Sequence, residues 1–212
     1  MTAAGGGSHV PGSTVVTHAL AQTPAGTATL SDITAADIDA IVRYWHCGGE
    51  AHLDALGIDR ALLGTPQDTR QRFVRAVRSG ALEQPNIACA INLNGVLVGY
   101  TLLNRYAPEI NYSHWHITAP ELRGARISSA LYPHRIKMYF DLTPMTRLIH
   151  QTRTSNVGVN RMLDKYVPVA ETRYIDRPDG VAAAGEFHLR YVSRSDVPAL
   201  FERAAQLRAS AG

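Results

Sequence analysis

The sequence predicts one mixed α/β domain, and three features of its pattern predict it. Helix start signals at Thr34 and at Thr65 each precede apolar residues at helical spacing. An Asn94-Gly95 pair between two apolar runs indicates a tight β-hairpin, because it supplies the two positive φ values of a type I′ turn. A strand, a small-residue turn and a helix then follow one another in residues 111–140. Helices and strands therefore alternate along one chain.

Composition sets limits on the class of protein. The chain has 212 residues, of which 45% are hydrophobic, enough for one domain with a full core. It contains no run of about eighteen apolar residues and no secretory signal pattern, so we expect neither a membrane span nor export. Its two cysteines, Cys47 and Cys89, cannot form a disulfide framework and fit a reducing compartment. We therefore expect a cytoplasmic protein without membrane contact.

The first part of the chain predicts a tail. Residues 1–26 are rich in Ala, Gly, Ser, Thr and Pro and almost lack charge, so we expect a flexible N-terminal tail, with at most a brief extended piece at Val15-Val16. Order is expected from about Thr27, with a probable edge strand at 27–30. Residues 27–212 then form the single domain.

The remaining elements follow from caps, turns and periodicity. Thr34 with Asp37 resembles a capping box for a helix that ends at Gly48. Thr65 begins a second helix, with Gly80 closing it. Further along the chain we expect strands at 87–93, 96–106, 112–117, 145–152, 173–175 and 187–192, and helices at 127–142, 156–166 and 196–209.

The strand, turn and helix of residues 111–140 predict an anion site. On the strand, Tyr112, His114 and His116 share one face. The basic loop 121–126 leads into the helix, whose first free N–H groups and positive end attract anions. The segment from Arg123 to Arg173 holds nine Lys and Arg against three Asp and Glu, a net charge of +6. This charge fits a polyanionic ligand or a solvated basic face equally well.

Two motifs resemble those of the GNAT superfamily of N-acyltransferases. Residues 120–131, read PELRGARISSAL, look like the turn and helix that hold the acyl donor in that family. Residues 156–166, read NVGVNRMLDKY, look like its second signature. The resemblance covers about 27–192 and implies the GNAT fold: a central mixed, mostly antiparallel sheet flanked by helices. It also implies acetyl-CoA or another acyl-CoA as co-substrate, with no metal.

The resemblance also implies where the donor binds. Strand amides would bond the pantetheine, the loop and helix start would hold the pyrophosphate, and two asparagines would bond the extended arm. Arg126 and Ser128 stand where the family usually has two small residues, so the phosphate loop is degraded. The implied donor-binding residues are Ile117, Thr118, Arg123, Gly124, Ala125, Arg126, Ser128, Ser129, Asn156 and Asn160.

Amide formation needs a base and a polarised carbonyl, and four residues are candidates for the acid–base work. His114 and His116 are suited to deprotonate an amine, since the unperturbed pKa of histidine is near 6.5; both would equally suit a packed sheet. Glu50 lies in a segment expected to border the acceptor site. Tyr166 lies three residues beyond Leu163, which occupies the usual place of the family's tyrosine.

Several alternatives stay open from the sequence. The main interpretation is an enzyme that acylates the amine of a small molecule from acyl-CoA. The second keeps the fold but takes the acyl group from aminoacyl-tRNA, whose phosphates suit Arg126 and the +6 segment. The third is a non-catalytic GNAT-like binding module. A homodimer is possible. His46, Cys47, Glu50 and His52 match no tight zinc spacing, so no metal is expected.

Overall fold

A computed structural model describes residues 15–78, 87–178 and 180–210. One eight-stranded sheet crosses the molecule in the order β1-β2-β3-β4-β5-β6-β8-β7. Within the described chain β5 and β6 are parallel, and all other neighbouring strands are antiparallel. The strands are β1 Thr17–Thr23, β2 Gly26–Asp32, β3 Ile87–Leu93, β4 Val96–Ala107, β5 Ile110–Ile117, β6 Arg147–Arg153, β7 Glu171–Ile175 and β8 Gly185–Ser193.

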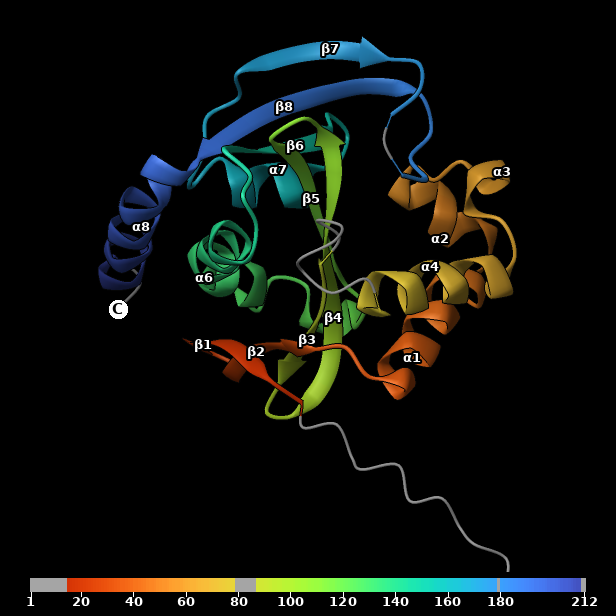
Figure 1. Cartoon of the computed structure of the whole chain (residues 1–212), viewed down its shortest axis with the longest axis horizontal. Coiled ribbons are helices and arrows are strands. Elements are labelled where there is room, and N and C mark those ends of the chain that lie inside the picture. The colour runs from red at the N-terminus through yellow and green to blue at the C-terminus, as the bar shows by residue number, and fades with distance from the viewer. Residues whose placement is uncertain (1–14, 79–86, 179, 211–212) are drawn as a thin grey trace, which may run out of the picture.

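Helices cover both faces of this sheet (Figure 1). The first four helices lie on one side of β4 and β5, while α6 and α8 lie on the other. The helices are α1 Ala35–His46, α2 Gly49–Leu56, α3 Arg60–Leu63, α4 Pro66–Arg78, α6 Ile127–Leu142, α7 Val157–Leu163 and α8 Val197–Ala209. This arrangement confirms the expected mostly antiparallel sheet flanked by helices. No helix in the described ranges is long and apolar enough to cross a membrane.

Local signals placed the early helices and the hairpin correctly. The amide of Thr34 donates to Asp37 Oδ2 at 2.8 Å, and the amide of Asp37 donates to Thr34 Oγ1 at 3.2 Å, which completes the capping box of α1. Thr65 caps α4 through Asp68 in the same way. Asn94 and Gly95 have φ values of 51° and 82°, as a type I′ turn requires. The predicted stop at Gly80 lies outside the described residues.

The N-terminal prediction was wrong over its last part. Residues 17–23 form β1, which pairs with β2 along its length, so 27–30 is an internal part of the sheet and not its edge. The strand is poor in apolar residues, and its order comes from this pairing. Two contacts with Asp32 support it, from His18 Nε2 at 2.7 Å and from the amide of Val16 at 3.1 Å. Residues 1–14 lie outside the described ranges.

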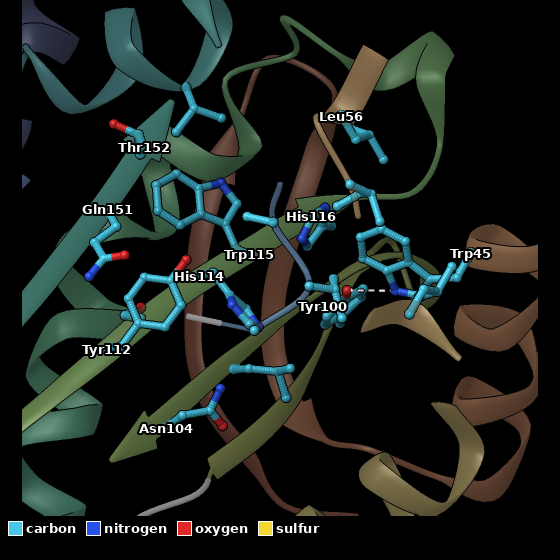
Figure 2. Close-up of a pocket in the computed structure, with 18 of the residues that line it drawn as sticks. Trp45, Leu56, Tyr100, Asn104, Tyr112, His114, Trp115, His116, Gln151 and Thr152 are labelled. Atoms are coloured by element: carbon cyan, nitrogen blue, oxygen red, sulfur yellow. Dashed lines mark hydrogen bonds between the residues drawn. The ribbon is translucent and has the colours of Figure 1, made fainter. Parts of the chain in front are cut away.

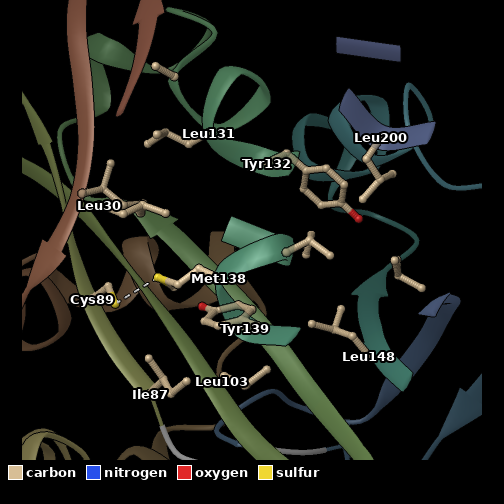
Figure 3. Close-up of a cluster of buried hydrophobic side chains, with 14 of the residues drawn as sticks. Leu30, Ile87, Cys89, Leu103, Leu131, Tyr132, Met138, Tyr139, Leu148 and Leu200 are labelled. Carbon is tan, nitrogen blue, oxygen red and sulfur yellow. Dashed lines mark hydrogen bonds between the residues drawn. The ribbon is translucent and has the colours of Figure 1, made fainter. Parts of the chain in front are cut away.

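Two hydrophobic clusters fix the central strands between the helix layers. On the α6 side, Tyr139 and Leu103 are fully buried (Figure 3). Ile136 of α6 is fully buried in the same cluster. On the other side, Ile41 of α1 belongs to a second cluster that includes Tyr100 of β4. Because β4 and β5 are covered on both faces, side chains from β5 reach either an apolar core or a partly open cavity. That cavity is the candidate site.

Candidate active site

The parallel strands β5 and β6 separate soon after they meet. Their pairing runs from Ile110 with Arg147 to Tyr112 with Ile149. Beyond this point β5 continues along β4 to Ile117, while β6 continues along β8. A gap therefore opens in the middle of the sheet, with peptide groups of β5 along one side.

His150 holds the point where the two strands separate. Its side chain is buried, and Nδ1 lies 3.3 Å from the carbonyl oxygen of Ser113. A carbonyl can only accept, so Nδ1–H donates and Nε2 accepts from the Tyr132 hydroxyl at 3.0 Å. Burial lowers the pKa of His150 to about 3, so the ring is neutral. Its role is to brace β5 against β6 at the start of the gap.

A cavity of about 900 Å³ lies against β4 and β5 on the side of the first four helices (Figure 2). It is large enough for a drug-sized molecule. Helix residues form its walls, β4 and β5 form its floor, and the end of β6 closes it near α7. The residues that define it include Trp45, Leu56, Arg72, Phe73, Tyr100, Tyr112, His114, Trp115, His116, Gln151, Arg153 and Asn156.

His116 belongs to a packed aromatic cluster on the cavity floor. Its ring stacks on Tyr100 with centroids 5.2 Å apart and an interplanar angle of 23°. Trp45 meets it edge-on at 4.8 Å and donates from Nε1 to the Tyr100 hydroxyl at 2.9 Å. Burial lowers the pKa of His116 to about 3. These contacts give His116 a packing role.

His114 is held differently from His116. Its ring meets Tyr112 edge-on at 5.3 Å and lines the cavity beside the gap. Its Nε2 atom is buried and has no hydrogen-bond partner among the described residues. Burial and the nearby Arg135 lower the pKa of His114 to about 4, so at neutral pH the ring is uncharged and keeps a basic lone pair. His114 thus presents an uncharged ring with an unpartnered nitrogen at the cavity, among the described residues.

The loop that leads into α6 is exposed at Gly124 and Arg126, whereas Ile127, the first residue of the helix, is buried. Arg126 is the N-cap residue of α6 and has a left-handed backbone, with φ 62°. Its side chain makes no capping hydrogen bond to the first turn of the helix. Gly124, also at positive φ (91°), shapes the loop before it. The amides of Ile127 and Ser128 therefore belong to an uncapped first turn, which suits an anion.

Comparison with solved structures identifies this fold. Mycobacterium smegmatis RimJ, solved in complex with CoA-disulfide, superposes with a TM-score of 0.70 at 17% identity, covering 92% of this chain and 95% of RimJ. The microcin C7 self-immunity acetyltransferase MccE, in complex with acetyl-CoA and AMP, gives 0.61 at 12% identity, covering 82% of this chain and 98% of MccE. A GNAT-family acetyltransferase from Bacillus anthracis gives 0.59 at 15%, covering 84% and 99%. This chain has the GNAT fold. At the level of sequence, no family model and no curated protein matches it.

Two groups that the GNAT resemblance assigned to donor binding make hydrogen bonds within the protein instead. The amide of Thr118 was expected to be exposed, but it donates to the carbonyl oxygen of Val98 at 2.9 Å. Because successive amides of a strand point to opposite sides, the amides of Trp115 and Ile117 face the gap instead. Asn160 is buried and its amide is occupied: Nδ2 donates to the carbonyl of Arg153 at 2.8 Å.

Asn160 Oδ1 is also occupied, since it accepts from Thr152 at 2.6 Å and from Arg190 at 3.0 Å. It therefore braces α7 against the sheet and has no group left for a ligand. Asn156 caps α7 by accepting from the amide of Val159 at 3.3 Å, and it also lines the cavity. Of these two asparagines, Asn156 is the one that lines the cavity and can contact a molecule bound there.

Two acid–base candidates lie away from the cavity floor. Glu50 is exposed and pairs with Arg60 at 2.9 Å, because α2 turns it outward. Tyr166 joins α7 to α6: its hydroxyl donates to the Ser129 carbonyl oxygen at 2.8 Å. The structure does not bring either side chain to His114. Among the described residues, no three His, Cys, Asp or Glu side chains form a group that could hold a metal ion.

Sequence reasoning missed three residues that shape this site. Trp115 lines the cavity from the gap, and the guanidinium of Arg135 lies over its ring. Arg153 closes the cavity at the end of β6. Trp115 has no signal of its own in the sequence, and the two arginines are marked there only as part of the basic segment 123–173. Their roles depend on neighbours that are distant in sequence.

Proposed function

We propose that this protein is an N-acyltransferase that moves an acyl group from acyl-CoA to the amine of a small molecule bound in the 900 Å³ cavity. The observation that carries the proposal is His114. Its neutral ring faces the cavity beside the β5–β6 gap, with a buried nitrogen that lacks a partner in the described chain. A base at the meeting point of two substrate sites is what amide formation requires.

The donor side of the proposal rests on the gap and on α6. An acyl-CoA needs strand amides for its arm and open helix amides for its pyrophosphate. The amides that face the gap and the uncapped turn that begins at Ile127 supply both. RimJ and MccE, which share the fold, were solved with CoA-disulfide and acetyl-CoA. This favours acyl-CoA over aminoacyl-tRNA as the donor.

The reaction follows from these positions. The amine attacks the thioester carbonyl, forming the C–N bond, and the charge that develops on the oxygen is met by the amide of Trp115 or Ile117. His114 takes the proton that the attacking nitrogen releases. The C–S bond then breaks, and the departing thiolate receives that proton. Atoms and charge balance without a further reactant.

A histidine with a pKa of about 4 is sufficient for this step because its surroundings also act on the substrate. Arg135 behind β5 and Arg153 at the cavity wall make a bound ammonium ion more acidic, so the amine enters as a free base. After the attack the nitrogen carries a formal positive charge and becomes a much stronger acid. His114 then needs only to accept a proton that is already easily lost.

Acetyl-CoA consumption with a panel of small amines tests this proposal. We expect His114→Gln to lower kcat by about a hundredfold, since the amide cannot accept the proton. His188→Gln is the matched control, because His188 lies on β8 and contacts Thr172 instead of the cavity. Equal activity of wild type and His114→Gln, or no acyl transfer to any amine, would overturn the proposal.

A further inference from the structure

The cavity is lined by cations without carboxylates. Arg72, Arg75 and Arg153 all line it, and none of its described lining residues is Asp or Glu. We propose that the acceptor carries a carboxylate or phosphate in addition to its amine, and that Arg153 binds this anionic group. The proposal rests on the acyltransferase function above and names the class of acceptor that the site takes.

Arg153 is fixed in place without a counter-ion. Its Nη1 donates to the carbonyl oxygen of Ala183 at 3.4 Å, and its guanidinium lies 5.9 Å from the Phe187 ring. Two glycines make room for it: a Cβ at Gly57 would lie 2.6 Å from Arg153 Cδ, and one at Gly185 would lie 2.4 Å from Nη2. No carboxylate of the described chain pairs with it. The fold therefore holds a guanidinium at the cavity wall without an ion pair to any described carboxylate.

A neighbouring arginine, Arg190, differs from Arg153 in having a carboxylate partner. Arg190 of β8 is buried, and its Nη2 lies 2.6 Å from Asp164 Oδ1. It also donates to Thr152, the residue next to Arg153, at 3.0 Å. The two guanidiniums thus share one region of the sheet, yet among the described residues an acidic partner is found for Arg190 and none for Arg153. A ligand anion would complete the charge balance of the other.

The remaining cations act in the same direction. Arg72 is held by backbone and hydroxyl oxygens, including the carbonyl of Leu63 and Thr69 Oγ1. The Asp68 carboxylate, on the same helix, lies within the field of Arg72 and partly offsets its charge, so Arg72 is a weaker anion site than Arg153. Arg135 is buried behind β5 without an acidic partner in the described ranges. A purely cationic amine would be repelled by this field, whereas an amine with its own anionic group is attracted.

The walls indicate what lies between the amine and the anion. Trp45, Phe73, Tyr100, Tyr112 and Phe187 line the cavity together with aliphatic residues. Flat apolar surfaces of this kind pack well against an aromatic or similarly apolar body. The acceptor class is therefore a small amine with an apolar body and an acid group.

Pairs of acylated products that differ in one anionic group test this inference directly, because neither member contains an ammonium group. The first pair is N-acetyl-L-phenylalanine and N-acetyl-L-phenylalaninamide, and the second is N-acetyl-O-phosphotyramine and N-acetyltyramine. Each is titrated calorimetrically into the protein in the presence of CoA. We expect the anionic member of at least one pair to bind about tenfold more tightly or better, and the stronger pair identifies carboxylate or phosphate.

Two variants assign that preference to Arg153. Arg153→Gln should reduce the difference within the pair to about twofold while leaving the affinity for the neutral member unchanged. Arg147→Gln, on the same strand but facing Tyr191 outside the cavity, should keep the full preference. Equal affinities within both pairs, binding of no probe, or an equal loss for both members in Arg153→Gln would overturn the inference. Tight CoA binding and turnover of neutral amines alone would contradict it while leaving the acyltransferase proposal intact.

Discussion

The guanidinium carbon of Arg135 lies 3.9 Å from the centroid of the Trp115 ring, on the side of β5 that faces α6. Arg135 is 3% exposed, and its polar contact is a 3.4 Å bond from Nη1 to Thr101 Oγ1. Its Nε and Nη2 have no hydrogen-bond partner in the described chain. A buried cation is thus held mainly by an aromatic face, and its field reaches His114 and His150.

Replacing Arg135 by methionine should therefore change the histidines more than the fold. Without the buried charge, the pKa values of His114 and His150 should rise, because one of the causes that oppose their protonation is removed. The unfolding free energy should stay within about 1 kcal/mol of wild type or increase, since an unpaired buried charge is costly. Histidine NMR titration and urea unfolding measure the two effects. Lys137→Met, which removes an exposed cation from the same helix, should leave both pKa values unchanged.

Acid should destabilise the protein in a defined window. Burial depresses the pKa of His150 to about 3 and that of His114 to about 4, so the unfolded chain binds more protons below its own pKa near 6.5. The contribution of these histidines to the unfolding free energy is therefore fully present above about pH 6.5. It decreases as the pH drops toward 4, by up to about 1.4 kcal/mol per pH unit for each histidine. Urea unfolding at several pH values measures the slope. His150→Gln should flatten it and His188→Gln should not; an identical slope in both would contradict the assignment.

The pH dependence of kcat should lack a histidine limb near neutral pH. The sequence led us to expect His114 to titrate near 6.5, but burial and Arg135 move its pKa to about 4. Protonation of His114 should therefore not reduce kcat until the pH approaches 4. A limb between pH 6 and 9 should follow the acceptor amine and shift when an amine of different pKa is used. A fixed limb near 6.5 with every acceptor would show that His114 is not the base.

Arg126 is the residue at which binding and stability should improve together. It adopts φ 62° at the start of α6, a conformation that costs a non-glycine residue about 1 kcal/mol. Arg126→Gly should raise the unfolding free energy by about that amount and leave CoA binding equal or tighter, because a pyrophosphate favours a small residue here. Arg123 has an ordinary φ of −65°, so Arg123→Gly is the control and should bring no gain in stability. Weaker CoA binding by Arg126→Gly would indicate a direct phosphate contact by the side chain.

Truncation separates the first strand from the residues before it. Removing residues 2–23 deletes β1, which pairs with β2 and packs against α6, so the melting temperature should drop by several degrees or more. Removing residues 2–14 deletes none of these contacts and should leave it within a few degrees of the full chain. Equal melting temperatures for the two truncated proteins would show that β1 contributes little to the sheet.

Elements whose signal lies within a few residues were predictable from the sequence. The caps at Thr34 and Thr65 and the Asn94-Gly95 turn are complete within four residues, so tertiary context has little to add. The strand β1 was missed because its order comes from a neighbouring strand and not from its own composition. The helices α2 and α3 were missed because eight and four residues are too few to show a periodicity.

The site was predictable only as far as strand alternation extends. That rule placed His114 and His116 on one face, and both line the cavity. It does not show that Tyr100 stacks on His116 or that His114 Nε2 is left without a partner, because those facts depend on β4 and α1. Nor does it show that the amide of Asn160 is already bonded. Whether a polar group is free for a ligand depends on contacts between distant segments.

The most direct test of the acyl-CoA assignment is a calorimetric titration of the purified protein with acetyl-CoA, with and without added tRNA. We predict saturable binding in the micromolar range that tRNA does not shift, because the proposal assigns the donor to the uncapped turn at Ile127 and the β5–β6 gap. Undetectable CoA binding, together with tRNA binding that weakens steeply as salt is raised, would contradict it.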